Sequence, residues 1–258
     1  MGTAAVQGSL WGARVRDYAA IAEGFFRPLY EAVFTEAVVG TGTRLLDVGC
    51  GPGLAAHLAA RRGAQVAGLD AAEASVAIAR ERTPQGDFRV GEMEELPWPD
   101  HTFDVVTSFN AFQFAADLRN ALREARRVTK PGGRVAMVVW GREEDCETVR
   151  TVAAVSKLLP PPPTAPGQPL SAPGRVEGLL QESGLAPLAS AEVECVFAFP
   201  DLETAVRGLM SAGVMVAAAR QVGAEPVQRA IAESLAPFRT EQGGYRQRNR
   251  FRYVIAST

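Results

Sequence analysis

The stretch Arg44-Leu45-Leu46-Asp47-Val48-Gly49-Cys50-Gly51-Pro52-Gly53 decides the fold of this 258-residue chain. Its first half is a short apolar run typical of a buried strand, and its glycines end that strand in a tight loop. A helical segment follows at 54–62, and a second apolar run at 65–69 ends at Asp70. Strand, glycine loop, helix and strand within about 27 residues form a βαβ unit, with two parallel strands and a right-handed crossover.

The same alternation continues along the chain and predicts a doubly wound α/β sheet. The pattern indicates further helices at 72–82, 117–128 and 175–183, and further strands at 87–90, 103–109, 134–140, 192–199 and 251–256.

Segments that do not follow this alternation of strands and helices are predicted to be additions to one sheet domain that spans 1–258. Residues 10–39 have helical periodicity, and Pro28 either breaks this stretch or starts a second helix at 29–39. We therefore expect 1–40 to be an N-terminal helical cap on a sheet core at 41–142. Seven prolines between Pro160 and Pro173 predict a stiff connection at 143–174. The remainder, 175–258, is expected to complete the sheet. Helices predicted at 201–219 and 225–235 form a cap inserted at 201–245.

Composition excludes several classes of protein. Lys and Arg total 27 against 29 Asp and Glu, a net charge of -2 that does not suit a nucleic-acid partner. No apolar run reaches the roughly 20 residues of a membrane span, and the N-terminus has no signal-peptide pattern. Three widely spaced cysteines indicate neither a disulfide framework nor a metal site, so a reducing cytoplasm is expected.

The glycine loop and Asp70 together indicate a ligand that contains adenosine. Ligands of open parallel sheets bind at the carboxyl ends of the strands, and an acid there can accept hydrogen bonds from both ribose hydroxyls. The third glycine comes one residue earlier than in the dinucleotide pattern G-x-G-x-x-G. Asp47 would repel a pyrophosphate and suits a ligand with an ammonium group. The plainer alternative is a helix cap and a solvated aspartate on an ordinary βαβ unit.

Four stretches in order resemble class I S-adenosylmethionine-dependent methyltransferases. They are DVGCGPG at 47–53, Asp70, GEMEELPWPD at 91–100 followed by FDVV at 103–106, and VTKPGGR at 128–134. The resemblance covers about residues 44–140 and is nearest to the small-molecule branch of ubiquinone and menaquinone biosynthesis methyltransferases. It implies a Rossmann-like sheet of seven strands, mostly parallel with an antiparallel last strand, with S-adenosylmethionine as cofactor and S-adenosylhomocysteine as product.

The resemblance also assigns roles to residues. Gly49 and Gly51 would offer backbone to the methionine part of the cofactor, Asp47 would help to hold its ammonium group, and Asp70 would bind the ribose with Ala71 packing nearby. The full set of expected cofactor-binding residues is Asp47, Gly49, Cys50, Gly51, Gly53, Asp70, Ala71, Glu92, Met93, Phe109 and Asn110.

Two members of this set carry alternatives. Glu92 stands where the family usually has Asp, so its longer side chain would have to reach the adenine amino group, while Met93 would pack on the adenine face or simply in its loop. Cys50 is expected to be a small buried filler, because nothing near it in the sequence marks a thiolate nucleophile.

Catalytic residues are harder to assign. Asn110 and Gln113 follow the strand at 103–109 and can orient a substrate, but neither takes a proton at neutral pH. Their plainer role is to cap the next helix. Catalysis is therefore expected to rest mainly on proximity and orientation, either with an acceptor that is already nucleophilic or with Tyr18 or Glu23 as the base. Of the two histidines, His57 is expected to be structural and His101 to be a solvated turn residue.

The sequence thus predicts methyl transfer to a small, apolar or aromatic acceptor at O, N or C. Alternatives are a cyclase or rearrangement catalyst, or an accessory protein that binds S-adenosylmethionine, on the same fold. A nicotinamide oxidoreductase is disfavoured by the loop spacing and Asp47. No metal, nucleic acid or membrane span is expected, and a homodimer is a further expectation.

Overall fold

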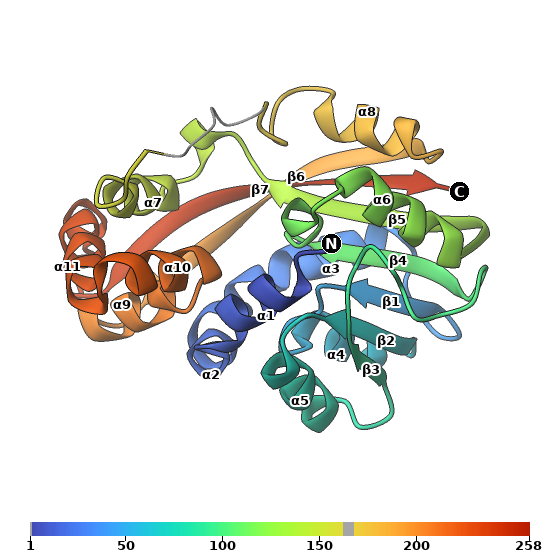
Figure 1. The fold of residues 1–258 in the computed structure, drawn as a ribbon, viewed down its shortest axis with the longest axis horizontal. Coiled ribbons are helices and arrows are strands. Elements are labelled where there is room, and N and C mark those ends of the chain that lie inside the picture. The colour runs from blue at the N-terminus through green and yellow to red at the C-terminus, as the bar shows by residue number, and fades with distance from the viewer. Residues whose placement is uncertain (1, 162–167) are drawn as a thin grey trace.

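The computed structural model describes residues 2–161 and 168–258 and contains the expected seven-stranded sheet (Figure 1). The strand order is β3-β2-β1-β4-β5-β7-β6, and β7 runs antiparallel to both neighbours while the other described pairs are parallel. The prediction of a mostly parallel sheet with an antiparallel last strand is confirmed. The strands are β1 (Arg44–Val48), β2 (Gln65–Asp70), β3 (Asp87–Val90), β4 (Phe103–Phe109), β5 (Thr129–Trp140), β6 (Ala186–Phe199) and β7 (Tyr245–Ser257).

Helices cover both faces of the sheet, and each face has its own apolar core. Side chains alternate along the strands, so Leu45 and Val105 point to one face and Leu46 and Val106 to the other. The first core lies under α3 (Arg27–Glu36), α4 (Leu54–Arg61) and α5 (Glu73–Arg82). The second lies under α6 (Leu118–Val128) and α8 (Arg175–Glu182).

The N-terminal segment is helical from Ala4, six residues before the predicted start. It consists of α1 (Ala4–Gly12), α2 (Val15–Asp17), a π-helical turn (Tyr18–Ala22), a 3₁₀ turn (Glu23–Phe26) and α3. Pro28 lies in the first turn of α3, where its missing N–H costs no hydrogen bond, so it starts this helix. In Figure 1 this segment runs between the sheet and a cluster of helices around α9, α10 and α11.

The C-terminal half carries more structure than its pattern predicts. β6 begins at Ala186 instead of 192, and α7 (Thr148–Ser156) lies in the stretch expected to be a connection. The helix predicted at 201–219 is two helices, α9 (Leu202–Met210) and α10 (Gly213–Val222), bent by 91°. α11 (Ala224–Ser234) follows before β7. Three of the predicted loop prolines, Pro162, Pro163 and Pro166, lie outside the described residues.

No single helix among the described residues is long and apolar enough to cross a membrane. The bent pair α9 and α10 meets that test only when its two helices are taken together, by length and composition.

Candidate functional site

The glycine loop between β1 and α4 is built from backbone that L side chains rarely adopt. Gly49, Gly51 and Gly53 have φ of 75°, 52° and 82°, in the left-handed region. The Gly49 and Cys50 N–H groups both donate to the carbonyl of Leu69 at the end of β2, at 2.7 and 3.0 Å. The loop therefore turns sharply at the carboxyl ends of β1 and β2, where parallel sheets bind ligands.

Asp70 holds this loop in place. Its Oδ2 accepts from the Gly51 N–H and its Oδ1 from the Ala72 N–H, both at 2.8 Å. One carboxylate thus ties the loop to the start of α5. Each oxygen keeps a second lone pair, so the group can still accept ligand hydroxyls.

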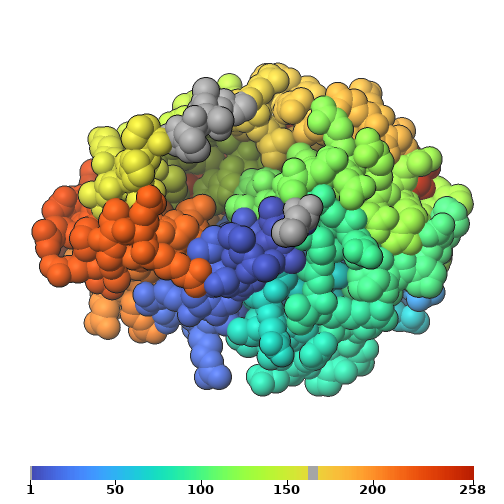
Figure 2. Space-filling view, viewed as in Figure 1, coloured from blue at the N-terminus to red at the C-terminus, as the bar shows by residue number. Residues whose placement is uncertain are grey.

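A cavity of about 440 Å³ extends from this loop to the helices around α9 and α10. Figure 2 shows the molecular surface hollowed between α1, α7 and α10. Gly51 lines the cavity, and a Cβ added there would meet no atom within 4 Å, so its backbone faces open space. The expected residues that line the cavity are Tyr18, Gly49, Gly51, Asp70, Ala71, Met93, Phe109, Asn110 and Gln113.

Four residues expected to bind the cofactor do not line the cavity, namely Asp47, Cys50, Gly53 and Glu92. Asp47 and Cys50 are buried behind the loop, and Cys50 fits against Gly68, where an added Cβ would lie 2.9 Å from its sulfur. Burial raises the pKa of the Cys50 thiol, which agrees with its expected role as a filler. Gly53 caps α4, and Glu92 contacts the N-terminal segment.

Carboxylates gather around the loop. Burial raises the pKa of Asp47 to about 7, despite a hydrogen bond from Thr107 Oγ1 at 2.8 Å, and the nearby carboxylates of Asp70 and Glu23 add to the shift. Burial also raises the pKa of Asp70, although its two backbone donors oppose this. Such a site favours a cation, because a positive ligand offsets the uncompensated negative charge. A ligand with sulfonium and ammonium groups fits it, whereas a pyrophosphate does not.

Glu23 makes contacts at the glycine loop that the sequence did not predict. It is 2% exposed, and its carboxylate accepts from Arg82 at 2.6 Å and from the Leu54 N–H at 2.9 Å. Burial raises its pKa even so, with Arg82 opposing the shift. The side chain therefore fills the anion position at the N-terminus of α4, the place where a dinucleotide fold binds pyrophosphate. It links the N-terminal segment to the loop and is not a free base.

The remaining candidate bases are equally unsuited to that role. Tyr18 lines the cavity, but burial raises the pKa of its phenol, and the carboxylates of Glu23, Asp70 and Asp47 add to the effect. Tyr18 is therefore a hydrogen-bond donor at neutral pH. His57 contacts Thr83 and His101 contacts the Thr129 carbonyl, and neither histidine lines the cavity.

Asn110 is the residue of the cavity lining, other than glycine, that has a positive φ. Its φ is 56°, which a residue with a side chain adopts at a cost, and such strain often marks a functional position. Its Oδ1 is buried without a hydrogen-bond partner among the described residues. The Gln113 Nε2 donates to the Asn110 carbonyl at 3.1 Å, so Gln113 supports the turn that carries Asn110. Asn110 thus carries a buried acceptor that no described residue satisfies.

The part of the cavity remote from the loop is aromatic. Phe25 stacks on Phe197 with ring centroids 5.1 Å apart and meets Phe199 edge-on at the same distance. Tyr30 contacts Phe109, which comes from the end of β4. Aromatic residues of the N-terminal segment line this cavity together with residues of β6, α7, α9 and α10. Those later contributions carry no local sequence signal.

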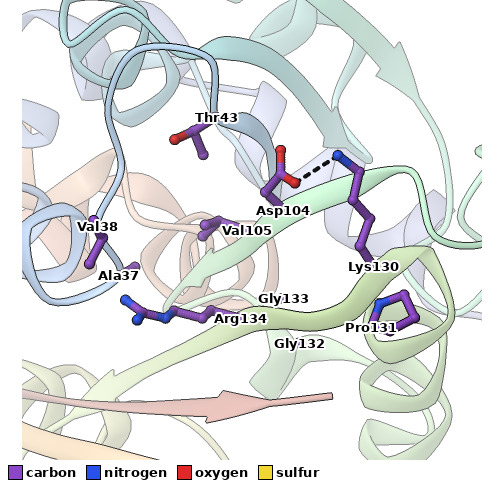
Figure 3. A pocket seen from close by; sticks show the side chains of 10 residues that line it. All are labelled: Ala37, Val38, Thr43, Asp104, Val105, Lys130, Pro131, Gly132, Gly133 and Arg134. Carbon is purple, nitrogen blue, oxygen red and sulfur yellow. Dashed lines mark hydrogen bonds and ion pairs between the residues drawn. The ribbon is translucent and has the colours of Figure 1, made fainter.

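A second cavity, of about 220 Å³, lies at the opposite ends of the strands (Figure 3). There Lys130 and Asp104 form an ion pair at 2.7 Å, and Arg134 donates to the Glu36 carbonyl at 2.8 Å. Lys130 and Asp104 thus satisfy each other, and Arg134 is bound to the backbone. The cavity lies away from the carboxyl ends of the strands, so it is not the candidate site. Among residues 2–161 and 168–258, no three His, Cys, Asp or Glu side chains are grouped to hold a metal.

Known proteins resemble this chain in sequence. Residues 46–137 match the family described as a methyltransferase domain. The malonyl-[acyl-carrier protein] O-methyltransferase of Erwinia pyrifoliae is 32% identical over 203 residues, which cover 79% of this chain and 74% of that protein. The ubiquinone biosynthesis O-methyltransferase of Hahella chejuensis is 34% identical over 152 residues, 54% of this chain and 64% of that protein.

Solved structures share the fold at lower identity. The YcgJ protein of Bacillus subtilis has a TM-score of 0.57 at 19% identity, covering 89% of this chain and 97% of that one. The [4+2]-cyclase SpnF has a TM-score of 0.56 at 22% identity, covering 89% and 80%. The loop, the carboxylate cluster and the sequence matches agree: the chain belongs to the S-adenosylmethionine-dependent methyltransferases with the methyltransferase domain.

Proposed function

We propose that this methyltransferase transfers the methyl group to a hydroxyl oxygen of a small, uncharged, largely apolar molecule. The observation that carries the proposal is the lining of the cavity. It is mostly aromatic and aliphatic, includes no Lys, Arg or His of the described residues, and has Asn110 among its few polar side chains. An anionic acceptor would leave its charge unpaired there, at a cost that disfavours it. The relatives named as O-methyltransferases support oxygen as the acceptor atom.

In this proposal the residues of the cavity bind the cofactor and the acceptor and orient them toward each other. When bound, S-adenosylmethionine supplies an electrophilic methyl group on a positively charged sulfur. The aromatic part of the cavity would hold the acceptor, and the Asn110 side chain would turn its amide oxygen to accept the hydrogen of the acceptor's hydroxyl. The cofactor would supply the methyl group for the new C–O bond, and its sulfur would keep the electron pair of the broken C–S bond. The hydroxyl proton leaves to water, because Tyr18 is already protonated and Glu23 is held by Arg82.

Calorimetry and a turnover assay test the function. We expect S-adenosylhomocysteine to bind with a Kd in the micromolar range and NAD to show no heat of binding. With S-adenosylmethionine, a panel of neutral phenols such as 2-naphthol should release S-adenosylhomocysteine, whereas naphthoic acids of the same size should not. Binding without release for any acceptor in the panel would favour the cyclase or accessory-protein alternative. Binding of NAD would overturn the cofactor assignment.

Replacing Asn110 with Gly tests the orienting role without adding strain, because glycine adopts the φ of 56° freely. We expect kcat/KM to fall about 10- to 100-fold, since a hydrogen bond that aligns the acceptor is lost. Folding stability should rise or stay equal. The matched control is Val38→Gly, which relieves the same backbone conformation at φ 56° in an exposed position outside the site. Equal kcat/KM in both variants would refute the role of Asn110.

Several expectations from the sequence belong to this proposal as well. A cytoplasmic location, a homodimer and the division of the chain into a core at 41–142 with caps at 1–40 and 201–245 stay predictions. The arrangement of α1, α9 and α10 around the cavity supports the view that the caps choose the acceptor.

A further inference from the structure

Glu92 contacts the N-terminus of α1. Its Oε2 accepts from the Ala4 N–H at 2.9 Å, and Gly2 packs so closely that an added Cβ would lie 1.9 Å from the same oxygen. Beside it, the Thr3 hydroxyl donates to the Phe114 carbonyl at 2.6 Å. A carboxylate at this end of a helix is favoured by the unpaired N–H groups and by the helix dipole. Glu92 therefore fastens the start of α1 to the loop that follows β3.

The middle of α1 lies directly on the residues that follow Asp70. A Cβ added to Gly8 would come 2.2 Å from the Ala71 carbonyl oxygen, and one added to Gly12 would meet the Ala72 Cβ at 3.4 Å. Glycine weakens a helix interior relative to alanine, so its presence at both positions needs a reason. The two glycines lie four residues apart on one face, and Gly8 lets that face come within backbone distance of Ala71.

The last turn of α1 is fastened to α10. The Arg220 guanidinium donates to the Ser9 hydroxyl at 3.0 Å and to the Ser9 carbonyl at 2.9 Å. The Trp11 ring lies against Gly213, where an added Cβ would be 2.7 Å from its Nε1. Gln7 and Trp11 line the cavity together with Asp70, Ala71 and Met93. α1 thus spans from α5 to α10 over the end of the cavity where the cofactor is expected.

The contacts at its two ends hold α1 in place, although the side chains of this helix are not buried. None of the residues of α1 is buried, and the first turn has no side-chain cap of its own. A segment with few buried apolar contacts opens at low cost, so a few polar contacts at its ends decide how long it stays closed. The mouth between α1, α7 and α10 remains open (Figure 2).

We propose that Glu92 is a positioning residue that latches α1 across the cofactor end of the cavity. α1 must release for the cofactor to exchange, while the acceptor exchanges through the mouth between α1, α7 and α10. The inference rests on the proposed function only in placing the cofactor beside Asp70. It gives Glu92 a task different from a contact with the adenine amino group.

The test measures how fast S-adenosylhomocysteine leaves the full-length protein, by chasing radiolabelled ligand with excess unlabelled ligand. Glu92→Ala should speed dissociation about tenfold, because a charged hydrogen bond that holds α1 is lost. Gly8→Leu should do the same by wedging α1 away from Ala71, and the two changes together should add little more. The matched controls are Glu95→Ala, in the same loop and exposed, and Ala5→Leu, on the exposed side of α1. Both controls should keep the wild-type rate.

An analogue separates the latch from a direct contact. S-inosylhomocysteine lacks the adenine amino group, so a direct contact from Glu92 would make the wild type prefer the adenosyl ligand, and Glu92→Ala would abolish that preference. A latch leaves the preference equal in both proteins. An unchanged dissociation rate in Glu92→Ala, or a preference that disappears with it, overturns the latch. Failure of S-adenosylhomocysteine to bind the wild type would instead overturn the proposed function.

Discussion

Replacing Asp47 with Asn is expected to raise the stability of the ligand-free protein at pH 8 and to weaken cofactor binding. The Asp47 carboxyl is 2% exposed, and burial raises its pKa to about 7. The fold therefore favours the protonated form. The protonated Asp47 carboxyl therefore stabilises the folded state relative to the unfolded state. This contribution is fully present below the ordinary pKa of 3.8 and is lost as the pH rises through about 7. At pH 8 the buried charge costs up to about 4 kcal/mol, by the difference between the two pKa values.

Asparagine removes this charge at nearly the same size. Thr107 Oγ1 can keep its bond to the side-chain oxygen or instead accept from the new amide while donating to the Leu46 carbonyl. We expect the Tm of ligand-free Asp47→Asn to exceed that of the wild type by roughly 5–10 °C at pH 8. At pH 5 the two should be equal within about 2 °C, because the wild-type carboxyl is then mostly protonated.

Binding should change in the opposite direction. Asp47 lies behind the loop and does not line the cavity, so its negative charge would attract the cationic ligand through the protein interior without direct contact, and the Kd for S-adenosylmethionine should rise about tenfold at pH 8. Wild-type affinity should fall by about the same factor as the pH drops below 7, because the protonated Asp47 carboxyl no longer carries that charge. The variant should lose that dependence. Calorimetry between pH 5.5 and 8.5 and thermal melts at the same pH values measure both effects.

Asp104→Asn is the matched control. Burial alone would raise the pKa of Asp104, but the hydrogen bonds from Lys130 and the Arg44 N–H outweigh it and hold the pKa below its ordinary value. Here the native state favours the charged form, so the variant should not gain stability at pH 8. A gain in Asp104→Asn equal to that in Asp47→Asn, or an unchanged Kd in the latter, would contradict the account of the buried charge.

The part of the fold that the sequence predicted is the part with local causes. Apolar runs of strand length, a glycine loop and amphipathic helices depend on near neighbours in the chain, so β1 to β5 and the parallel sheet follow from pattern alone. The 91° bend between α9 and α10 does not, because the stretch at 201–219 has no proline and its glycines at 208 and 213 are compatible with a helix. Gly208 and Gly213 instead accommodate Ile21 and Trp11, which are distant in sequence.

The candidate site divides in the same way. Asp70 meets the glycine loop because parallel strands end at one edge, which a βαβ unit guarantees. Glu23 and Glu92 were less predictable, since their partners Arg82 and Ala4 lie 59 and 88 residues away. No periodicity or sequence motif links residues at these separations, so the sequence does not predict the two contacts. The aromatic part of the cavity was the least predictable, because residues of β6, α7 and α10 line it only as a result of how the whole cap packs.

The glycine loop offers the other prediction with a large effect, a contrast between Gly49→Ala and Gly51→Ala. Both glycines have positive φ, so alanine costs roughly 1–2 kcal/mol at either position. At Gly49 the new Cβ would also lie 2.1 Å from the Ala111 Cβ, where the loop meets the segment after β4. Overpacking at such a contact adds about 1–3 kcal/mol. Gly49→Ala should therefore lower the Tm by roughly 5–15 °C, as a thermal melt would show.

Gly51→Ala should separate binding from stability. Its Cβ meets no atom within 4 Å, so it costs only the backbone strain, and the Tm should fall by less than about 4 °C. The methyl group instead enters the cavity space that the cofactor is expected to occupy, so the Kd for S-adenosylhomocysteine should rise about tenfold or more. If Gly51→Ala bound as tightly as the wild type, the cofactor would not contact this part of the loop. Equal losses of Tm in both variants would mean that backbone strain alone, and not the approach of Ala111, requires glycine at position 49.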